Sequence, residues 1–381
     1  MSDGPDPGRL AGLLARLVAI DTQNPPGNEE PAAELLAAEL RAHGFTADVR
    51  AVAPGRANVI ARFVNGSGPS FALNSHLDTV PVGSGWSSDP FRLIERDGRL
   101  YGRGTCDAKG QVSAMAEAGR LLLADRGSWR GTLVLAFVAD EEINSIGAKA
   151  AATERFDWVI VGEPTRNAVY AAHKGCVRPL IRVRGKSAHS GRPELGSNAI
   201  VAASRLVEML AQRDAMLRQR EHRLVGRASL TVSRITGGIA DNIVPDLCEI
   251  VLDERVLPGA RLESTLDDLH ELLRLARQEH GVDADLAEVR TAAGSAETPP
   301  DSPLLHAALV ASQRHGVSLP QPGGLTGGCD LVHFHAAGSV GIILGPGSLD
   351  QAHQPDEFVP AADLAQAALI YRDIAKAMLR A

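Results

Sequence analysis

The chain has 381 residues, more than one hydrophobic core usually serves, so two domains are predicted. Lys and Arg total 39 against 46 Asp and Glu, and the net charge of -7 argues against a nucleic-acid partner. The longest apolar runs are too short to cross a membrane. The first residues show no signal-peptide pattern, and four scattered cysteines argue against a disulfide framework. We therefore expect a cytoplasmic protein that binds neither nucleic acid nor membrane.

The first half of the chain alternates between helical and strand-like patterns. The patterns predict helices at 8–20, 31–43 and 146–153 and one that ends near 123. Short apolar runs lie at 57–64 and 70–74, and strands are predicted at 132–138, 158–161 and 168–173. This alternation predicts an α/β architecture with a largely parallel core sheet.

The pattern changes after about residue 176. Strands are predicted at 179–185, 229–238 and 248–256, and helices at 197–218 and 261–279. These elements form a small α+β unit. The chain then returns to a helix, the strand VGIILG and a closing helix at 361–379. The sequence thus predicts one α/β domain that is interrupted by an inserted α+β domain.

The stretch ALNSHLDTVP (72–81) places His76 and Asp78 at the end of an apolar run whose last strand residue is expected to be Leu73. Residues two apart in a strand point to the same side, so both side chains are expected at the rim of the sheet. Taken alone, the stretch fits a surface loop equally well.

Other strand ends and loops carry further metal-type ligands. The carboxyl ends of parallel strands meet at one edge of a sheet, where ligand sites form. The residues expected to meet there are His76, Asp107 in GRGTCDAKG, Glu141 and Glu142 after LVLAFVAD, Glu163 in WVIVGEP, and His353 in AHQPDE. Each acid taken singly fits a solvated loop, but the set together predicts a metal site.

Clustered carboxylates repel one another unless cations neutralise them, and imidazole with carboxylate suits zinc, manganese or cobalt. Two such ions can share one bridging carboxylate. His333 and His335 in LVHFHAAG are a rival pair, although core or surface histidines are the favoured interpretation. The serine-nucleophile motif G-x-S-x-G, a dinucleotide fingerprint and a phosphate-binding loop are all absent from the sequence.

At this point the motifs resemble those of the di-zinc aminoacylase and carboxypeptidase family, which includes acetylornithine deacetylase and succinyl-diaminopimelate desuccinylase. The matching runs are SHLDTVP, YGRGTCDAKG, DEE, GEPT followed by HKG, GKSAHSGRPELGSNAI, DERVLPG, and GPG with AHQPDE. The resemblance implies a zinc-peptidase-like catalytic domain with a central mixed sheet (1–176 and 290–381), interrupted by a lid and dimerisation domain (177–289), in a homodimer.

The same resemblance implies roles for individual residues. His76, Asp107 and Glu163 would hold one metal ion, while His353, Glu142 and Asp107 would hold the other, with Asp107 bridging. Asp78 would orient the His76 ring through its second nitrogen.

Beyond the metal ligands, the resemblance makes Glu141 the general base. His189 in GKSAHSG would reach the active site of the partner subunit, and Asn242 and Arg255 would hold the α-carboxylate of the substrate. A salt bridge with Asp253 or Glu254 is the plain alternative for Arg255.

Two departures from the family pattern concern further substrate contacts. Lys174, after His173, stands where desuccinylases present arginines, which argues against a succinyl substrate. Gly327 lies in the run before Asp330 where relatives often carry threonine or serine, so a hydroxyl contact there is in doubt. We keep Lys174 and Gly327 as candidate substrate-binding positions.

The predicted chemistry follows from charge. Two divalent ions, zinc or alternatively cobalt or manganese, lower the pKa of a shared water and supply hydroxide near neutral pH. Glu141 can take the proton of that water and return it to the leaving amine. With the resemblance to the deacetylase family, this chemistry implies hydrolysis of the amide bond of an N-acyl amino acid. A dipeptidase or carboxypeptidase is the alternative, and a noncatalytic binding protein is disfavoured because no ligand is missing.

Overall fold

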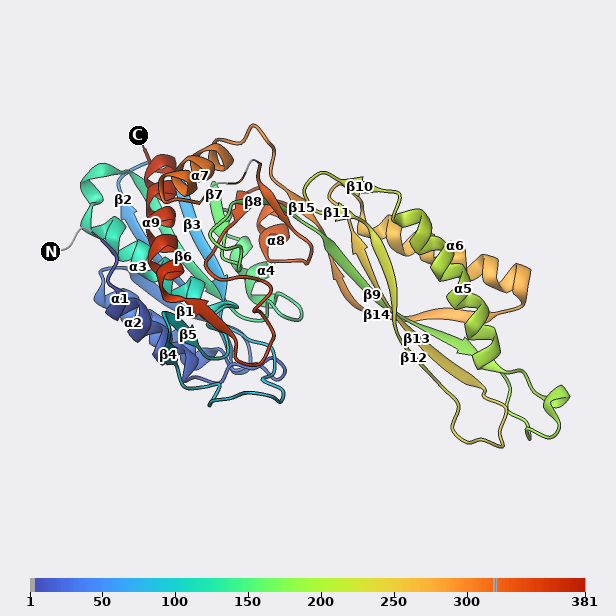
Figure 1. The fold of residues 1–381 in the computed structure, drawn as a ribbon. Coiled ribbons are helices and arrows are strands. Elements are labelled where there is room, and N and C mark those ends of the chain that lie inside the picture. Colours follow the sequence, from blue (N-terminus) through green and yellow to red (C-terminus); the bar gives the residue numbers. More distant parts are fainter. Residues whose placement is uncertain (1–3, 318, 320, 381) are drawn as a thin grey trace. The chain divides into compact units, whose positions relative to one another are not determined.

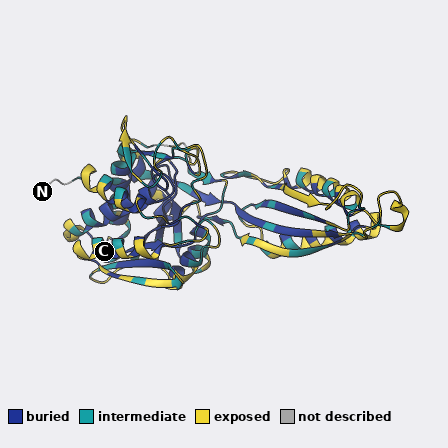
Figure 2. Ribbon diagram, turned by 90° about the horizontal axis from the view of Figure 1, so that it is seen from below, coloured by how far each residue is buried: buried dark blue, intermediate teal, exposed yellow. Residues whose placement is uncertain are grey.

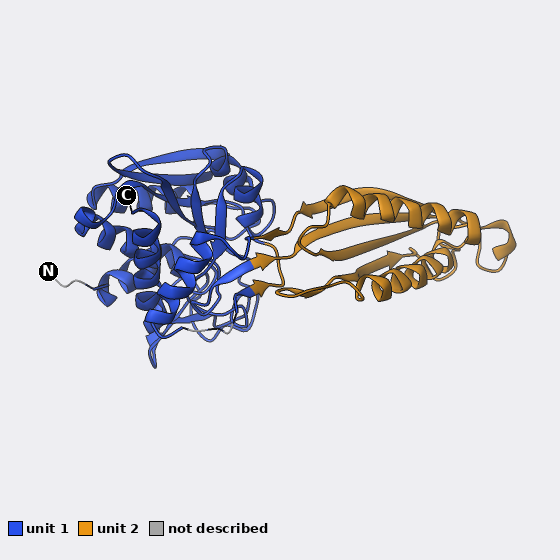
Figure 3. Ribbon diagram, turned by 90° about the horizontal axis from the view of Figure 1, so that it is seen from above, with its two compact units in different colours: residues 1–171, 298–323, 329–381 blue, residues 172–297, 324–328 orange. Residues whose placement is uncertain are grey.

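The computed structural model describes residues 4–317, 319 and 321–380. The chain forms two compact units (Figure 3). Unit 1 comprises Met1–Ala171, Thr298–Gly323 and Cys329–Ala381, and unit 2 comprises Ala172–Glu297 and Gly324–Gly328. The expected domain limits at 176/177 and 289/290 lie a few residues inside these junctions and remain a prediction. Among the described residues, no helix combines the length and apolar character that a membrane span needs.

Unit 1 is built around a mixed sheet in the order β1-β2-β6-β3-β7-β17-β8 (Figure 1). Its strands are β1 (Thr46–Ala53), β2 (Arg56–Asn65), β3 (Ser70–His76), β6 (Gly131–Val138), β7 (Trp158–Val161), β8 (Tyr170–His173) and β17 (Val340–Ile343). The central strands β6, β3, β7 and β17 run parallel, and the flanking pairs are antiparallel. The predicted α/β class and mixed sheet are confirmed.

Helices cover this sheet and bury its apolar strands, which appear dark blue in Figure 2. They are α1 (Pro7–Val18), α2 (Glu30–Ala42), α3 (Lys109–Ala124), α4 (Ile146–Ala152), α7 (Pro303–Arg314), α8 (Leu331–Ala336) and α9 (Ala361–Met378). Helix α3 packs against α1 and α9, and α2 packs against β1 and β2. Because both faces of the central strands are covered, their sequences are continuous apolar runs rather than alternating ones.

Short strands complete unit 1 and its junction with unit 2. Strands β4 (Ile94–Arg96), β5 (Arg99–Tyr101) and β18 (Phe358–Pro360) form a small sheet in unit 1. Strands β15 (Ala296–Glu297) and β16 (Gly323–Leu325) pair with β8, and β10 (Glu221–His222) pairs with β11 (Gly226–Arg227). Single turns of 3-10 helix lie at Arg126–Ser128 and Pro193–Leu195.

Unit 2 is an antiparallel sheet in the order β12-β13-β9-β14 that packs against two helices. Its elements are β9 (Gly175–Arg184), α5 (Ala199–Leu217), β12 (Ser229–Gly237), β13 (Leu247–Val256), α6 (Leu262–His280) and β14 (Asp283–Ala293). Alternate strand residues such as Ile181, Ile250 and Leu252 enter a core with Leu206 and Leu273 of the helices. This alternation is the pattern expected of a sheet with only one covered face.

Candidate metal centre

His76 is the last residue of β3, and its ring contacts carboxylates on both sides. Its Nε2 lies 3.0 Å from Oδ1 of Asp107, and its Nδ1 lies 3.0 Å from the carbonyl oxygen and 3.5 Å from Oδ1 of Asp78. The side chain is only 1% exposed. Burial alone would lower the pKa of His76, but the contacts with Asp107 and Asp78 raise this pKa well above its usual value.

Asp107 lies in the loop between β5 and α3, and its two carboxylate oxygens face different histidines. Oδ1 contacts His76, and Oδ2 lies 3.4 Å from Nε2 of His353. Glycines let this loop turn tightly: Gly104 adopts a φ of 83°, and a side chain on Gly110 would meet the carbonyl oxygen of Thr105. Burial acts to raise the pKa of Asp107, but the contacts with His353 and His76 hold it well below its usual range.

Glu142 completes a cluster with these residues. Its Oε1 lies 3.2 Å from Nε2 of His353, and ligand atoms of His76, Asp107 and Glu142 all lie within 4.8 Å of one another. His353 adopts a φ of 66° in its loop, and its side chain is 51% exposed, so one edge of the cluster is accessible. Burial is the main reason that the pKa of Glu142 is raised.

Glu163 and Glu141 are the other acids that strand ends bring to this edge. Glu163 follows β7 and is 5% exposed, and its Oε1 has no hydrogen-bond partner among the described residues. Burial raises the pKa of Glu163 well above its usual value, and the charge of Asp107 adds to this. Burial also raises the pKa of Glu141, helped by the charge of Glu163. The two carboxyl groups therefore sense one another electrostatically.

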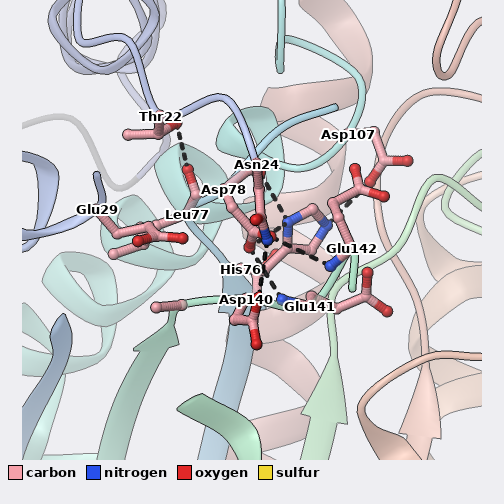
Figure 4. Close-up of polar contacts among 12 residues, drawn as sticks. Thr22, Asn24, Glu29, His76, Leu77, Asp78, Asp107, Asp140, Glu141 and Glu142 are labelled. Carbon is pink, nitrogen blue, oxygen red and sulfur yellow. Dashed lines mark hydrogen bonds and ion pairs between the residues drawn. The ribbon is translucent and has the colours of Figure 1, made fainter. Parts of the chain in front are cut away.

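Asp78 holds the turn that carries the two glutamates (Figure 4). Its Oδ1 accepts a hydrogen bond from the backbone N–H of Glu141 (3.0 Å), and its Oδ2 accepts one from that of Glu142 (3.2 Å). Asp78 is fully buried, which acts to raise its pKa, but the His76 contact and the hydrogen bond from Asn24 lower the pKa overall. Asp78 therefore supports the histidine and the glutamate turn together.

Sequence reasoning missed a second carboxylate that supports the bridging position. Glu357 is buried, and its Oε1 accepts hydrogen bonds from the backbone N–H groups of Cys106 (2.8 Å) and Asp107 (3.0 Å). Its Oε2 accepts a hydrogen bond from buried Arg103 at 2.6 Å. Burial raises the pKa of Glu357 to about 7. The residue lies within the AHQPDE run, but its partners are more than 240 positions away in sequence, so spacing gave no signal.

In unit 2, His189 and Asn242 lie on adjoining exposed loops. The backbone N–H of Ser190 donates to the carbonyl oxygen of Asn242 (2.9 Å), and His189 forms an isolated bridge with Ile243. Among the described residues, the side chain of His189 makes one hydrogen bond, a local one in which the backbone N–H of Gly191 donates to its Nδ1 (3.0 Å). These loops precede β13, so both candidate residues stand at one end of the unit 2 sheet.

Arg255 stands near the opposite end of β13. Its guanidinium binds Asp253 through Nε (2.6 Å) and a terminal nitrogen (3.2 Å), which is the salt bridge foreseen as the alternative role. From Leu247 to Arg255 the strand advances about 26 Å at roughly 3.3 Å per residue. The structure therefore does not bring Arg255 and Asn242 of one chain together.

Lys174 and Gly327 also lie in unit 2. Lys174 is largely buried, and its Nζ donates to the carbonyl oxygen of Arg227 (2.5 Å). Burial lowers its pKa, and the charges of Arg255 and Arg218 lower it further. A side chain at Gly327 would meet nothing within 4 Å, so nothing in the structure requires glycine there.

The rival histidines lie in α8 and join no metal-type cluster among the described residues. His335 Nε2 accepts a hydrogen bond from the backbone N–H of Gly341, and burial lowers the pKa of His333 to about 4. Asp330, just before α8, is buried with one carboxylate oxygen unpartnered among the described residues, and burial raises its pKa to about 7.

The residues of the unit 1 cluster fit a pair of divalent cations. The cluster joins a carboxylate that has one histidine on each oxygen, a buried glutamate oxygen without a hydrogen-bond partner among the described residues, and acids whose pKa values burial has raised. Divalent cations can bind such a set of ligands and neutralise its acids. Such an arrangement can polarise a carbonyl group and lower the pKa of a water molecule.

Comparison with known proteins agrees with this geometry. The model of peptidase family M20/M25/M40 matches residues 72–377. The acetylornithine deacetylase of Vibrio cholerae is 34% identical over 357 residues, covering 91% of this chain and 92% of the relative. That of Myxococcus xanthus is 34% identical over 370 residues, covering 93% of each.

Solved structures share the fold. An aminopeptidase of Bacillus cereus has a TM-score of 0.80 at 22% identity, covering 98% of this chain and 99% of the other. A dinuclear metal-binding peptidase of Bacillus subtilis has a TM-score of 0.73 at 18% identity, covering 98% of each chain.

Proposed function

Since the chain belongs to peptidase family M20/M25/M40, we propose that it is a metal-dependent hydrolase that cleaves the amide bond of an N-acyl amino acid. An acetylated amino acid is the substrate class that the relatives named acetylornithine deacetylase suggest. The observation that carries the proposal is the bridging geometry of Asp107, whose two oxygens each face a histidine.

Two divalent ions, zinc with cobalt or manganese as alternatives, would be held by this chain's own residues. The first would take His76, Asp107 and Glu163, and the second His353, Glu142 and Asp107. When bound, such ions polarise the scissile carbonyl and lower the pKa of a water molecule. Glu163 supports this division because its free oxygen has no other partner among the described residues.

Glu141 is the proposed general base. A carboxylate whose pKa is raised toward neutrality binds a proton readily and gives it up again. In hydrolysis the water oxygen bonds to the acyl carbon, and Glu141 takes the water's proton. The carbon–nitrogen bond then breaks, and the proton passes to the leaving nitrogen. Asp78 orients His76 and holds the backbone of Glu141.

Substrate binding is proposed to involve unit 2 residues of two chains. Arg255 and Asn242 stand at opposite ends of β13, so they can contact one small substrate only if different chains of a homodimer supply them. His189, which adjoins Asn242, would then act in the partner's site as an oxyanion donor. Lys174, close enough to Arg255 to be affected by its charge, and Gly327 remain candidate contacts for the substrate.

The homodimer itself has support from an exposed sheet edge. Strand β12 has no neighbour on its outer side among the described residues, and an unpaired edge is a template for another strand. Near it, Ile235 and Val201 are each 50% exposed and Ile239 is 84% exposed. Apolar side chains of this kind favour contact with a second copy.

A substrate panel tests the proposed function. Purified protein is loaded with zinc, cobalt or manganese and offered acetylornithine, other N-acetyl amino acids, succinyl-diaminopimelate and dipeptides. We expect the highest kcat/KM for an acetylated amino acid, and no hydrolysis without metal. A clear preference for dipeptides would show that the protein is a peptidase and not a deacylase. If no substrate is hydrolysed with any of the metals, both activities are contradicted.

A further inference from the structure

Asn24 lies in the segment between α1 and α2 and contacts two acids beside the candidate metal centre. We propose that Asn24 is a positioning residue: its side-chain amide ties Asp78 to Asp140 and so fixes the turn that presents Glu141 and Glu142. This inference rests on the proposed function, because it concerns how the same site is held in shape.

The contacts of Asn24 are short and buried. Its Nδ2 donates one hydrogen bond to Oδ2 of Asp78 and one to Oδ1 of Asp140, both at 2.9 Å. The residue is 3% exposed, and the two acids are 0% and 1% exposed. Figure 4 shows the amide between the two carboxylates. Both N–H bonds of the amide are therefore used, one for each acid.

Charge explains why an amide occupies this place. Two buried carboxylates that share one partner repel each other, and their proximity must be compensated by donors. Arg56 pairs directly with Asp140 at 2.8 Å and with Glu29, whereas Asp78 acts on Arg56 only through its charge, which helps to raise the pKa of Arg56. A neutral amide supplies a donor to each acid, whereas a carboxylate in its place would add a third negative charge.

The network reaches the candidate catalytic groups from both sides of the turn. Asp78 accepts hydrogen bonds from the backbone N–H groups of Glu141 and Glu142. Asp140 directly precedes them and has a φ of 72°, a left-handed conformation that is uncommon for a residue with a side chain. Asn24 thus connects Asp78, which accepts hydrogen bonds from the N–H groups of the turn, with Asp140, which begins the turn.

The backbone places Asn24 accurately. Its own N–H donates to the carbonyl oxygen of Thr79 (2.8 Å), and the N–H of Thr79 donates to the carbonyl oxygen of Thr22 (3.1 Å). The hydroxyl of Thr22 donates to the carbonyl oxygen of Leu77 (2.8 Å). The segment therefore lies alongside residues 77–79, directly after the candidate ligand His76.

The test compares Asn24→Asp and Asn24→Ala with wild type and with Asn65→Ala. Asn65 is a matched control: its Nδ2 also donates two hydrogen bonds, to the carbonyl oxygens of Arg126 and Trp129, at the opposite end of the sheet. For each protein we measure the thermal unfolding midpoint, the bound metal, the visible absorption of the cobalt-loaded form, and kcat and KM for the best substrate.

We expect both Asn24 variants to shift the cobalt absorption bands and to lower kcat by roughly 10- to 100-fold. Losses of this size are usual when a residue that holds the metal ligands in place is removed. KM should change less than kcat, and Asn24→Asp should be the worse variant. Asn65→Ala should keep the wild-type spectrum and kcat. If Asn24→Asp does not fold, Asn24→Ala carries the test, because it removes both donors without adding a charge.

Wild-type cobalt spectra and kcat in the folded Asn24 variants would overturn the positioning role while the proposed function stands. The same losses in Asn65→Ala would also overturn it, since removing any asparagine that donates two hydrogen bonds would then have the effect. A wild-type protein that binds no cobalt and hydrolyses no substrate would contradict the proposed function, and the positioning role with it.

Discussion

The candidate ligands of unit 1 and the candidate substrate residues of unit 2 are held in very different ways. His76 is 1% exposed and contacts two carboxylates, whereas the exposed side chain of His189 makes one local hydrogen bond among the described residues. Asp107 is held through its backbone by Glu357 as well as by contacts of its side chain. Asn242 is exposed, and its carbonyl oxygen accepts a hydrogen bond from the backbone N–H of Ser190 in the neighbouring loop.

This difference indicates that the candidate metal centre is built by the packing of one chain. His76, Asp78 and Asp107 are oriented by buried hydrogen bonds, which is how a site is preorganised. Within the part of the chain that the structure describes, the side chains of His189 and Asn242 have no comparable buried support. Their proposed roles depend on a second chain or on the substrate, and mutations should separate the two regions.

The largest effect is expected from Asp107→Ala. Because this one carboxylate faces both histidines, its loss should remove both ions together with all measurable activity. Metal analysis of the purified, remetallated variant checks this, with Glu163→Ala as the matched comparison that should weaken mainly one ion. Full occupancy by two ions in Asp107→Ala would show that the bridging assignment is incorrect.

Subunit mixing tests whether the unit 2 loop serves another chain. Glu141→Ala and His189→Ala should each be inactive, but a mixed dimer has one site with both residues intact if His189 acts in the partner's site. Random exchange makes half the dimers hybrid and half of their sites complete, so roughly a quarter of wild-type activity should return. Mixtures that stay inactive despite proven exchange would place His189 in its own chain's site.

A smaller loss is expected from Arg255→Lys. A guanidinium grips a carboxylate through two donors, and lysine cannot copy that geometry. We expect kcat/KM to fall roughly tenfold for free acid substrates, within the range of charged hydrogen bonds, and to change little for the corresponding amides. An equal loss on both would mean that Arg255 only supports structure through Asp253.

The smallest effect concerns His333, a half-buried histidine of unit 1 outside the cluster. Burial lowers its pKa to about 4, against about 6.5 in an unfolded chain. Between these values the unfolded state binds more protons, so this residue makes the free energy of unfolding fall as the pH drops through that window. The free energy of unfolding, measured with urea, should therefore fall less for His333→Gln than for wild type between about pH 7 and pH 5. If the free energy of unfolding falls equally in His333→Gln and in wild type over this pH range, the pKa of His333 is not lowered.

The strand-end ligands could be predicted because parallel strands fix where their carboxyl ends meet. Glu163 follows β7 and Glu142 follows β6 closely, and both strands neighbour β3 with His76. Continuous apolar runs in the sequence predicted these strands well. These runs placed the end of β3 at Leu73, however, because Asn74 and Ser75 are polar; both are buried and bond to carbonyl oxygens of the neighbouring strands, so β3 continues to His76.

The supporting network could not be predicted in the same way. Asn24 precedes two prolines and resembles an ordinary loop residue, and its partners Asp78 and Asp140 are 54 and 116 positions away. Strands β1 and β14 were also missed: β14 is an edge strand with many exposed residues, so its apolar signal is weak. Contacts that depend on tertiary packing leave no local pattern.

The most direct test of the proposed hydrolase is Glu141→Gln. This substitution keeps the size of the side chain and removes the base, so the variant should still bind two ions per chain. Its kcat on the best substrate should fall by about 10²- to 10⁴-fold, the usual contribution of general acid–base catalysis. Metal content and kcat are measured on the same preparation. Wild-type turnover in a fully loaded Glu141→Gln protein would contradict the account.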